Sequence, residues 1–150
     1  MKPAIEYLTE LHLKSDTPIW VNPVGGLGDV LMLSTALKRS HDKYGKKFHL
    51  CRRTHYSQFF LNHPAIAEIG NPPEDAEIVC NDYWSRSEFN DTSYKALRIM
   101  LKIFGVEDCD DESLYLPISR RMKRRNYSSK IFHGVGRMLS YHFRQRVHAR

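Results

Sequence analysis

The chain has few of the residues that mark fibrous, low-complexity or membrane-spanning proteins. It holds 8 glycines and 7 prolines in 150 residues and shows no internal repeat, which excludes collagen-like and low-complexity classes. The longest apolar stretch, near residues 30–33, ends at Ser34 and Thr35 and is far shorter than the roughly 18 residues that a membrane-spanning helix needs. Glu6 and Glu10 lie where a secretory signal would need an apolar run. We therefore expect a cytoplasmic protein.

Cysteine and histidine are not spaced as a disulfide framework or a metal site requires. The 3 cysteines lie far apart without a CxxC pair, and the 8 histidines show no HxxxH or HExxH spacing. A disulfide scaffold or a zinc site would need such pairs. We expect reduced, structural cysteines and no bound metal.

Acidic residues are missing from the C-terminal part of the chain. Residues 1–117 hold 13 Lys and Arg against 17 Asp and Glu, whereas residues 118–150 hold 10 Lys and Arg and no acid. Pro117 marks the change. The sequence thus predicts three parts: an N-terminal amphipathic helix within residues 1–17, a domain over residues 18–117, and a basic, partly helical tail over residues 118–150.

The domain alternates short β-rich runs with helical periodicity. Strands are predicted at 19–22, 48–51, 67–69 and 76–80, helices at 3–14, 29–44, 56–61 and 94–104, and a last extended run at 114–116. Strands that alternate with helices at these lengths are typical of a parallel sheet. The predicted fold class is α/β, a Rossmann-like parallel sheet with helices on both faces.

A glycine-rich turn follows the first predicted strand. Gly25, Gly26 and Gly28 lie between that strand and the next helix, where a doubly wound sheet binds its ligands. A dinucleotide motif starting at Gly26 would need glycine at the position of Leu31, and a P-loop would end in Gly-Lys-Ser/Thr, whereas this turn ends in Gly28-Asp29. Both nucleotide motifs are excluded, and the three glycines remain candidate substrate-binding residues.

Asp29 is the titratable group of this turn. A carboxylate at a helix start can cap free N–H groups and interact with the helix dipole. It can also act as a general base that takes a proton from an incoming hydroxyl. Both interpretations are open from the residue pattern.

Trp84 and Arg86 follow the strand predicted at 76–80, so they can border the same cleft. An aromatic ring suits stacking against a sugar, and a guanidinium suits phosphate. Ordinary packing with a surface ion pair is the alternative for both.

The segment 24–37, VGGLGDVLMLSTAL, resembles the opening motif of the heptosyltransferase-like family, glycosyltransferase family 9. Three further elements resemble the family in the same order: the Asn62-His63-Pro64 element within 61–69, the run 94–106, and Leu114 to Pro117. The likeness covers residues 18–117. The glycine-rich turn also resembles that of glycogen and starch synthases. Those enzymes carry a lysine at the position where this sequence has Pro23.

The resemblance implies the N-terminal, acceptor-side domain of a GT-B glycosyltransferase. Such an enzyme moves a sugar from a nucleotide sugar, for example ADP-heptose, to a lipopolysaccharide or another cell-surface glycan, with Asp29 as catalytic base and without a metal. Residues 118–150 are too few for the donor-binding domain. We therefore expect this chain alone to be weakly active or inactive, with a missing domain or a partner supplying the donor site.

The basic tail leaves several interpretations open. It can be a solvated end, an amphipathic segment that attaches to the anionic inner face of the membrane, or a polyanion-binding segment for nucleic acid. The alternative to a transferase is accordingly a non-catalytic module whose α/β body binds a partner and whose tail binds polyanions.

Overall fold

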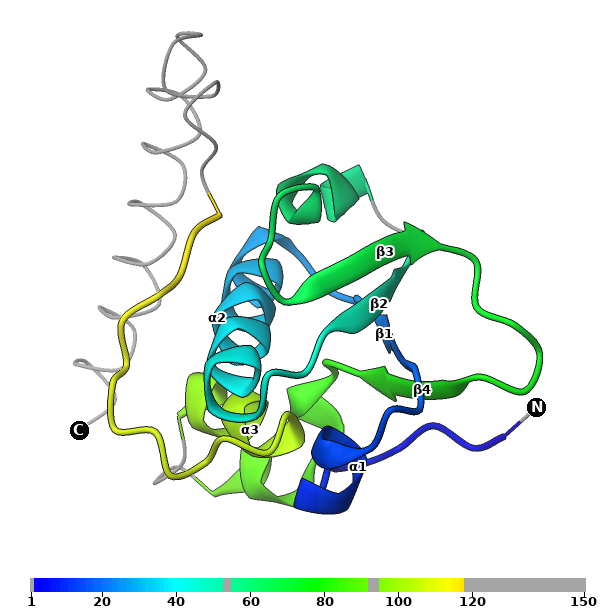
Figure 1. Cartoon of the computed structure of the whole chain (residues 1–150). Coiled ribbons are helices and arrows are strands. Elements are labelled where there is room, and N and C mark those ends of the chain that lie inside the picture. Colours follow the sequence, from blue (N-terminus) through cyan, green and yellow to red (C-terminus); the bar gives the residue numbers. More distant parts are fainter. Residues whose placement is uncertain (1, 53–54, 92–94, 118–150) are drawn as a thin grey trace, which may run out of the picture. The chain divides into compact units, whose positions relative to one another are not determined.

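The computed structural model describes residues 2–52, 55–91 and 95–117, which fall within one compact unit, 1–117. Its sheet has four strands, all parallel, in the order β3-β2-β1-β4 (Figure 1). The strands are β1 (Ile19–Asn22), β2 (Phe48–Cys51), β3 (Ile66–Gly70) and β4 (Glu77–Cys80). The predicted α/β class with a parallel sheet is confirmed.

In the part of the chain that the structure describes, three α-helices and three 3-10 turns connect or flank these strands. They are α1 (Glu10–Lys14), α2 (Leu27–Tyr44), α3 (Ala96–Ile103), η1 (His55–Phe60), η2 (Tyr83–Ser85) and η3 (Ser87–Asn90). Helix α2 ends at Gly45, whose φ of 71° is the left-handed conformation that stops helices without a Cβ penalty.

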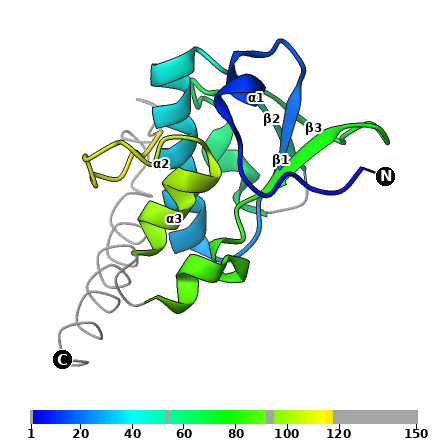
Figure 2. The same ribbon diagram turned by 90° about the horizontal axis from the view of Figure 1, so that it is seen from below.

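The hydrophobic core lies between the sheet and the pair α2 and α3, which lie side by side in Figures 1 and 2. Alternate residues of the strands point into it, because side chains along a strand alternate between the two faces. Its fully buried members include Ile19, Val21, Phe48, Leu50, Val79, Leu33, Leu37, Met100 and Ile103.

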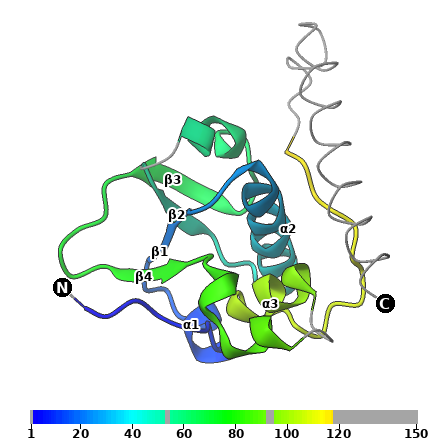
Figure 3. The ribbon, with the colours of Figure 1, turned by 180° about the vertical axis from the view of Figure 1, so that it is seen from behind.

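The N-terminal segment is helical over a shorter range than the sequence predicts. Of the helix expected at 3–14, only Glu10–Lys14 forms. The Ile5 N–H instead donates to the Ile78 carbonyl at 2.7 Å, so the chain runs in parallel beside β4 (Figure 3). This pairing satisfies backbone groups of β4 at the edge of the sheet, which a helix in that place would leave unpaired.

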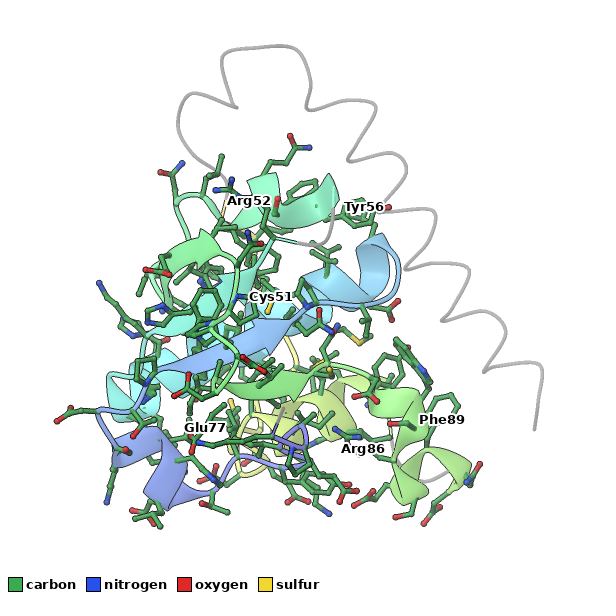
Figure 4. All side chains as sticks on the ribbon, turned by 90° about the vertical axis from the view of Figure 1, so that its right-hand side faces the viewer. Cys51, Arg52, Tyr56, Glu77, Arg86 and Phe89 are labelled. Atoms are coloured by element: carbon green, nitrogen blue, oxygen red, sulfur yellow. The ribbon has the colours of Figure 1, made fainter. Side chains whose placement is uncertain are left out.

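The two faces of the sheet are covered differently. A right-handed crossover puts the β3–β4 connection on the face opposite α2, because β4 lies on the other side of β1 from β2 and β3. That connection, residues 71–76, contains Pro72 and Pro73 and forms no helix. Within the described residues, α2 and α3 pack against each other on one face of the sheet. Figure 4 looks onto the opposite face.

The acidic stretch after α3 is held to the two helices by ion pairs. Its partners are basic side chains of α2 and of the α3 start: Lys43–Asp108, Arg39–Asp111 and Lys95–Glu112, at 2.7–2.9 Å. The acidic stretch, residues 107–112, thus lies along basic positions of α2 and of the start of α3.

The Ser34–Thr35 pair has a structural role. The Ser34 hydroxyl donates to the Tyr115 carbonyl at 3.0 Å, and the Tyr115 N–H donates to the Thr35 hydroxyl at 2.9 Å. The extended run predicted at 114–116 therefore lies against α2, although it is not a strand of the sheet.

No helix of the described residues is long and apolar enough to cross a membrane. The basic tail, residues 118–150, lies outside the described part of the chain.

Candidate functional site

The glycine-rich turn lies at the carboxyl edge of the sheet, between β1 and α2. Strands β1 and β4 are neighbours, but the chain leaves β1 toward β2 on the other side. This reversal of strand order is the topological switch point, where open α/β sheets place their ligands. Gly25 and Gly26 are exposed there, and Gly28 is half-buried as the second residue of α2.

The carboxylate of Asp29 is held by two hydrogen bonds from opposite sides of the switch point. Its Oδ2 accepts the Gly26 N–H at 2.7 Å, and its Oδ1 accepts the Tyr83 hydroxyl at 3.0 Å. Gly26 precedes α2, whereas Tyr83 begins η2, just after β4. A carboxylate has about four acceptor positions, so this half-buried group retains capacity for a further donor.

Gly25 leaves room for the Asp29 carboxylate next to the turn. Its φ is 93°, which side chains rarely adopt, and a Cβ built on it would lie 2.2 Å from Asp29 Oδ2. Gly26 is less constrained, since its nearest such contact is 4.0 Å. The residue type at 25 is therefore set by the position of Asp29.

Asn81 fixes the other end of the turn. It is fully buried; its amide donates to the Val24 carbonyl at 3.0 Å, and its side-chain oxygen accepts the Val24 N–H at 2.7 Å. Together with Tyr83 it ties the turn after β1 to the segment after β4. The sequence pattern did not single out Asn81 or Tyr83. Their position directly after a strand that borders the switch point was the signal that could have indicated them.

Trp84 and Arg86 have different environments. The Trp84 side chain is 40% exposed and packs edge-to-face on Tyr83, with ring centroids 5.2 Å apart. Arg86 is only 8% exposed; its guanidinium donates to the Glu6 carbonyl at 3.0 Å and lies 3.3 Å from Asp82. Trp84 thus packs on the residue that bonds Asp29, while the contacts of Arg86 join η2 to the N-terminal segment (Figure 4).

A charged network joins η3 to α3 and to the N-terminal segment. The Glu88 carboxylate pairs with the Lys102 ammonium and accepts the Tyr7 hydroxyl at 2.9 Å. The hydrogen bond from Lys102, helped by further hydrogen bonds, lowers the pKa of Glu88 to about 2. Glu88 is therefore a paired anion at neutral pH.

Within the described ranges, no group of three or more His, Cys, Asp and Glu side chains is arranged to hold a metal ion. All three cysteines are thiols.

Comparison of the chain with protein-family models, curated proteins and solved structures gives no match. The described residues form a small α/β domain with a four-stranded parallel sheet, and the Asp29 carboxylate lies at its switch point.

Proposed function

We propose that this domain is the acceptor-side half of a GT-B glycosyltransferase of the heptosyltransferase-like kind, with Asp29 as its general base. One observation carries the proposal: the Asp29 carboxylate lies at the switch point of a parallel sheet, held by Gly26 and Tyr83. In this class of fold, that edge of the sheet faces the reacting groups.

The chemistry needs a carboxylate that is oriented but still able to accept a proton. The acceptor hydroxyl attacks the anomeric carbon of a nucleotide sugar, the bond from that carbon to the diphosphate oxygen breaks, and the nucleoside diphosphate leaves. The hydroxyl becomes more nucleophilic as its proton moves to a base. The two donors orient the Asp29 carboxylate, and its remaining lone pairs are available to a sugar hydroxyl.

Capping alone accounts for only one of the two hydrogen bonds. The Gly26 N–H belongs to the start of α2, so its bond to Oδ2 is a helix cap. The Tyr83 hydroxyl comes from a different segment and bonds the other oxygen. A cap does not need this second partner, whereas a base that must be aimed does.

The proposal extends to the other components. The donor would be a nucleotide sugar such as ADP-heptose, bound by a second domain or partner, and the acceptor a lipopolysaccharide or cell-surface glycan. The basic tail would hold the protein at an anionic membrane surface, where such a glycolipid lies.

The test measures the rate of sugar transfer by the full chain. A heptosyltransferase-type donor-binding domain is added as a second polypeptide. We expect Asp29→Asn to lower the rate by about 10²- to 10⁴-fold, the usual contribution of a general base. Asp42→Asn is the matched control, because Asp42 lies on the same helix and pairs with Lys38 at the surface.

The two variants should differ little in the free energy of unfolding, since a first-turn carboxylate contributes about 0.3–1 kcal/mol. Equal transfer rates for Asp29→Asn and the unmodified chain would exclude Asp29 as the base.

A further inference from the structure

Exposed aromatic side chains pack on Tyr83, whose hydroxyl donates to the Asp29 carboxylate. Among the described residues, four large apolar side chains are exposed, and two of them, Trp84 at 40% and Phe89 at 47%, lie in η2 and η3. Both rings pack edge-to-face on Tyr83, with centroids 5.2 and 5.7 Å away. We call Tyr83, Trp84 and Phe89 the aromatic platform.

Hydrogen bonds fix the backbone that carries the platform. The Arg86 N–H donates to the Tyr83 carbonyl at 3.2 Å, and the Phe89 N–H donates to the Arg86 carbonyl at 3.1 Å. The buried Arg86 side chain anchors both turns to the N-terminal segment. Pre-organised aromatic rings bind with little loss of conformational entropy, which makes exposed rigid rings good contact surfaces.

The platform joins directly to a hydrogen-bond acceptor. The hydroxyl of Tyr83, whose ring supports both exposed rings, donates to Asp29 Oδ1 at 3.0 Å. An apolar ring face next to a carboxylate matches a pyranose, which has an apolar C–H face and hydroxyl donors at its rim.

The charge around the platform selects against anions. Residues 81–91 contain Asp82, Glu88 and Asp91 but a single base, Arg86. That base is engaged with Asp82 and the Glu6 carbonyl, and the nearby Lys102 is paired with Glu88. These bases are therefore not available to an anionic ligand. A phosphorylated or carboxylated ring would be repelled by the Asp29 carboxylate, which accepts the neutral Gly26 N–H and Tyr83 hydroxyl, whereas a neutral ring would not.

We propose that the aromatic platform binds a neutral sugar ring of the acceptor, stacked on Trp84 and Phe89 with a hydroxyl directed to Asp29. This rests on the proposed function for the identity of the acceptor, and it goes further by naming the ring that is recognised. Trp84 and Phe89 are binding residues in this proposal, and Asp29 is the base.

A glycan microarray of neutral, carboxylated and phosphorylated oligosaccharides, probed with the full chain, tests it. We expect neutral glycans to be retained and Trp84→Ala to weaken the binding at least about tenfold, the scale of a central aromatic contact. Leu11→Ala is the matched control, because Leu11 is 81% exposed in α1 and outside the platform, and it should bind like the unmodified chain.

On the microarray, any of three results would overturn the inference: no glycan retained, retention of charged glycans only, or equal binding by Trp84→Ala and Leu11→Ala. Asp29→Asn separates this inference from the proposed function. Glycan binding that persists in Asp29→Asn while transfer is lost supports both. Transfer that persists in Asp29→Asn refutes the base alone, and an unchanged acceptor KM in Trp84→Ala refutes the platform alone.

Discussion

The two ends of the sheet use buried polar groups differently. At the amino edge, the residue Lys46 is 8% exposed, its ammonium donates to the carbonyls of Ser15 and Thr17, and desolvation by burial lowers its pKa. At the carboxyl edge, Asp29 is half-buried and keeps acceptor positions open beside exposed aromatic rings. The amino edge thus uses its charges for structure, and the carboxyl edge has the composition of a binding site.

The largest effect should follow from Gly25→Ala at the carboxyl edge. Its Cβ would collide with Asp29 Oδ2, and its positive φ adds strain of about 1–2 kcal/mol. We expect transfer to fall about 100-fold or more, as for loss of the base itself. Gly45→Ala is the matched control, since Gly45 also has a positive φ but nothing within 4 Å of a Cβ.

Gly45→Ala should therefore lower the free energy of unfolding by a similar strain while leaving transfer intact. Urea titration and the transfer assay measure the two quantities. A Gly25→Ala protein that is destabilised but fully active would show that the carboxylate does not need its present position.

At the amino edge, Lys46→Met should cost about 1–2 kcal/mol of stability without affecting transfer. The substitution keeps the apolar stem but removes two hydrogen bonds from a charged donor to the Ser15 and Thr17 carbonyls. Water replaces part of this loss, because Ser15 is half-buried and Thr17 is exposed. Thermal or urea unfolding gives the change. A loss of transfer in a folded Lys46→Met protein would contradict the division between the two edges.

His63 makes the amino edge sensitive to acid. It precedes β3, and its Nδ1 accepts the Ala65 N–H at 3.1 Å while Nε2 lies 3.0 Å from the Ser34 carbonyl. Desolvation by burial lowers the pKa of His63 to about 4.

Because the folded pKa lies below that of the unfolded chain, protonation favours unfolding, and stability falls as pH drops from about 6.5 toward 4. The expected loss from His63 between pH 7 and pH 5 is about 2 kcal/mol. Urea unfolding at several pH values measures it. His63→Gln should flatten the dependence in this window, and an unchanged slope in that variant would refute the assignment.

The smallest effect should come from Tyr83→Phe. The ring that supports Trp84 and Phe89 remains, and only the hydroxyl that orients Asp29 is lost. We expect about a tenfold slower transfer with a stability change of about 1 kcal/mol, the net contribution of one hydrogen bond. Equal rates for the variant and the unmodified chain would make this bond incidental to catalysis.

Local patterns predicted much of the framework. The strands at 19–22 and 48–51 coincide with β1 and β2, because short β-branched and aromatic runs next to glycine and proline are local signals. The turn at Gly25 and its position before a helix could be predicted for the same reason.

Long-range contacts could not be predicted. The pairing of Ile5 beside β4 replaced the first half of the expected helix, and the hydrogen bonds of Asn81 and Tyr83 join residues more than 50 positions apart. Such contacts depend on the order of strands in the sheet, which periodicity does not encode. For the same reason the sequence could not separate Trp84 from Arg86, for which both a cleft position and ordinary packing were open. The Trp84 side chain is exposed, and the Arg86 side chain is buried and paired with Asp82.

Amide chemical-shift mapping of the full chain tests most directly that the carboxyl edge is the binding edge. The probe is the neutral oligosaccharide that the microarray retains best. The account predicts the largest shifts at residues 24–29 and 81–89 and none at residues 13–17 and 45–47. Shifts concentrated at the amino edge, or none at either edge, would contradict it.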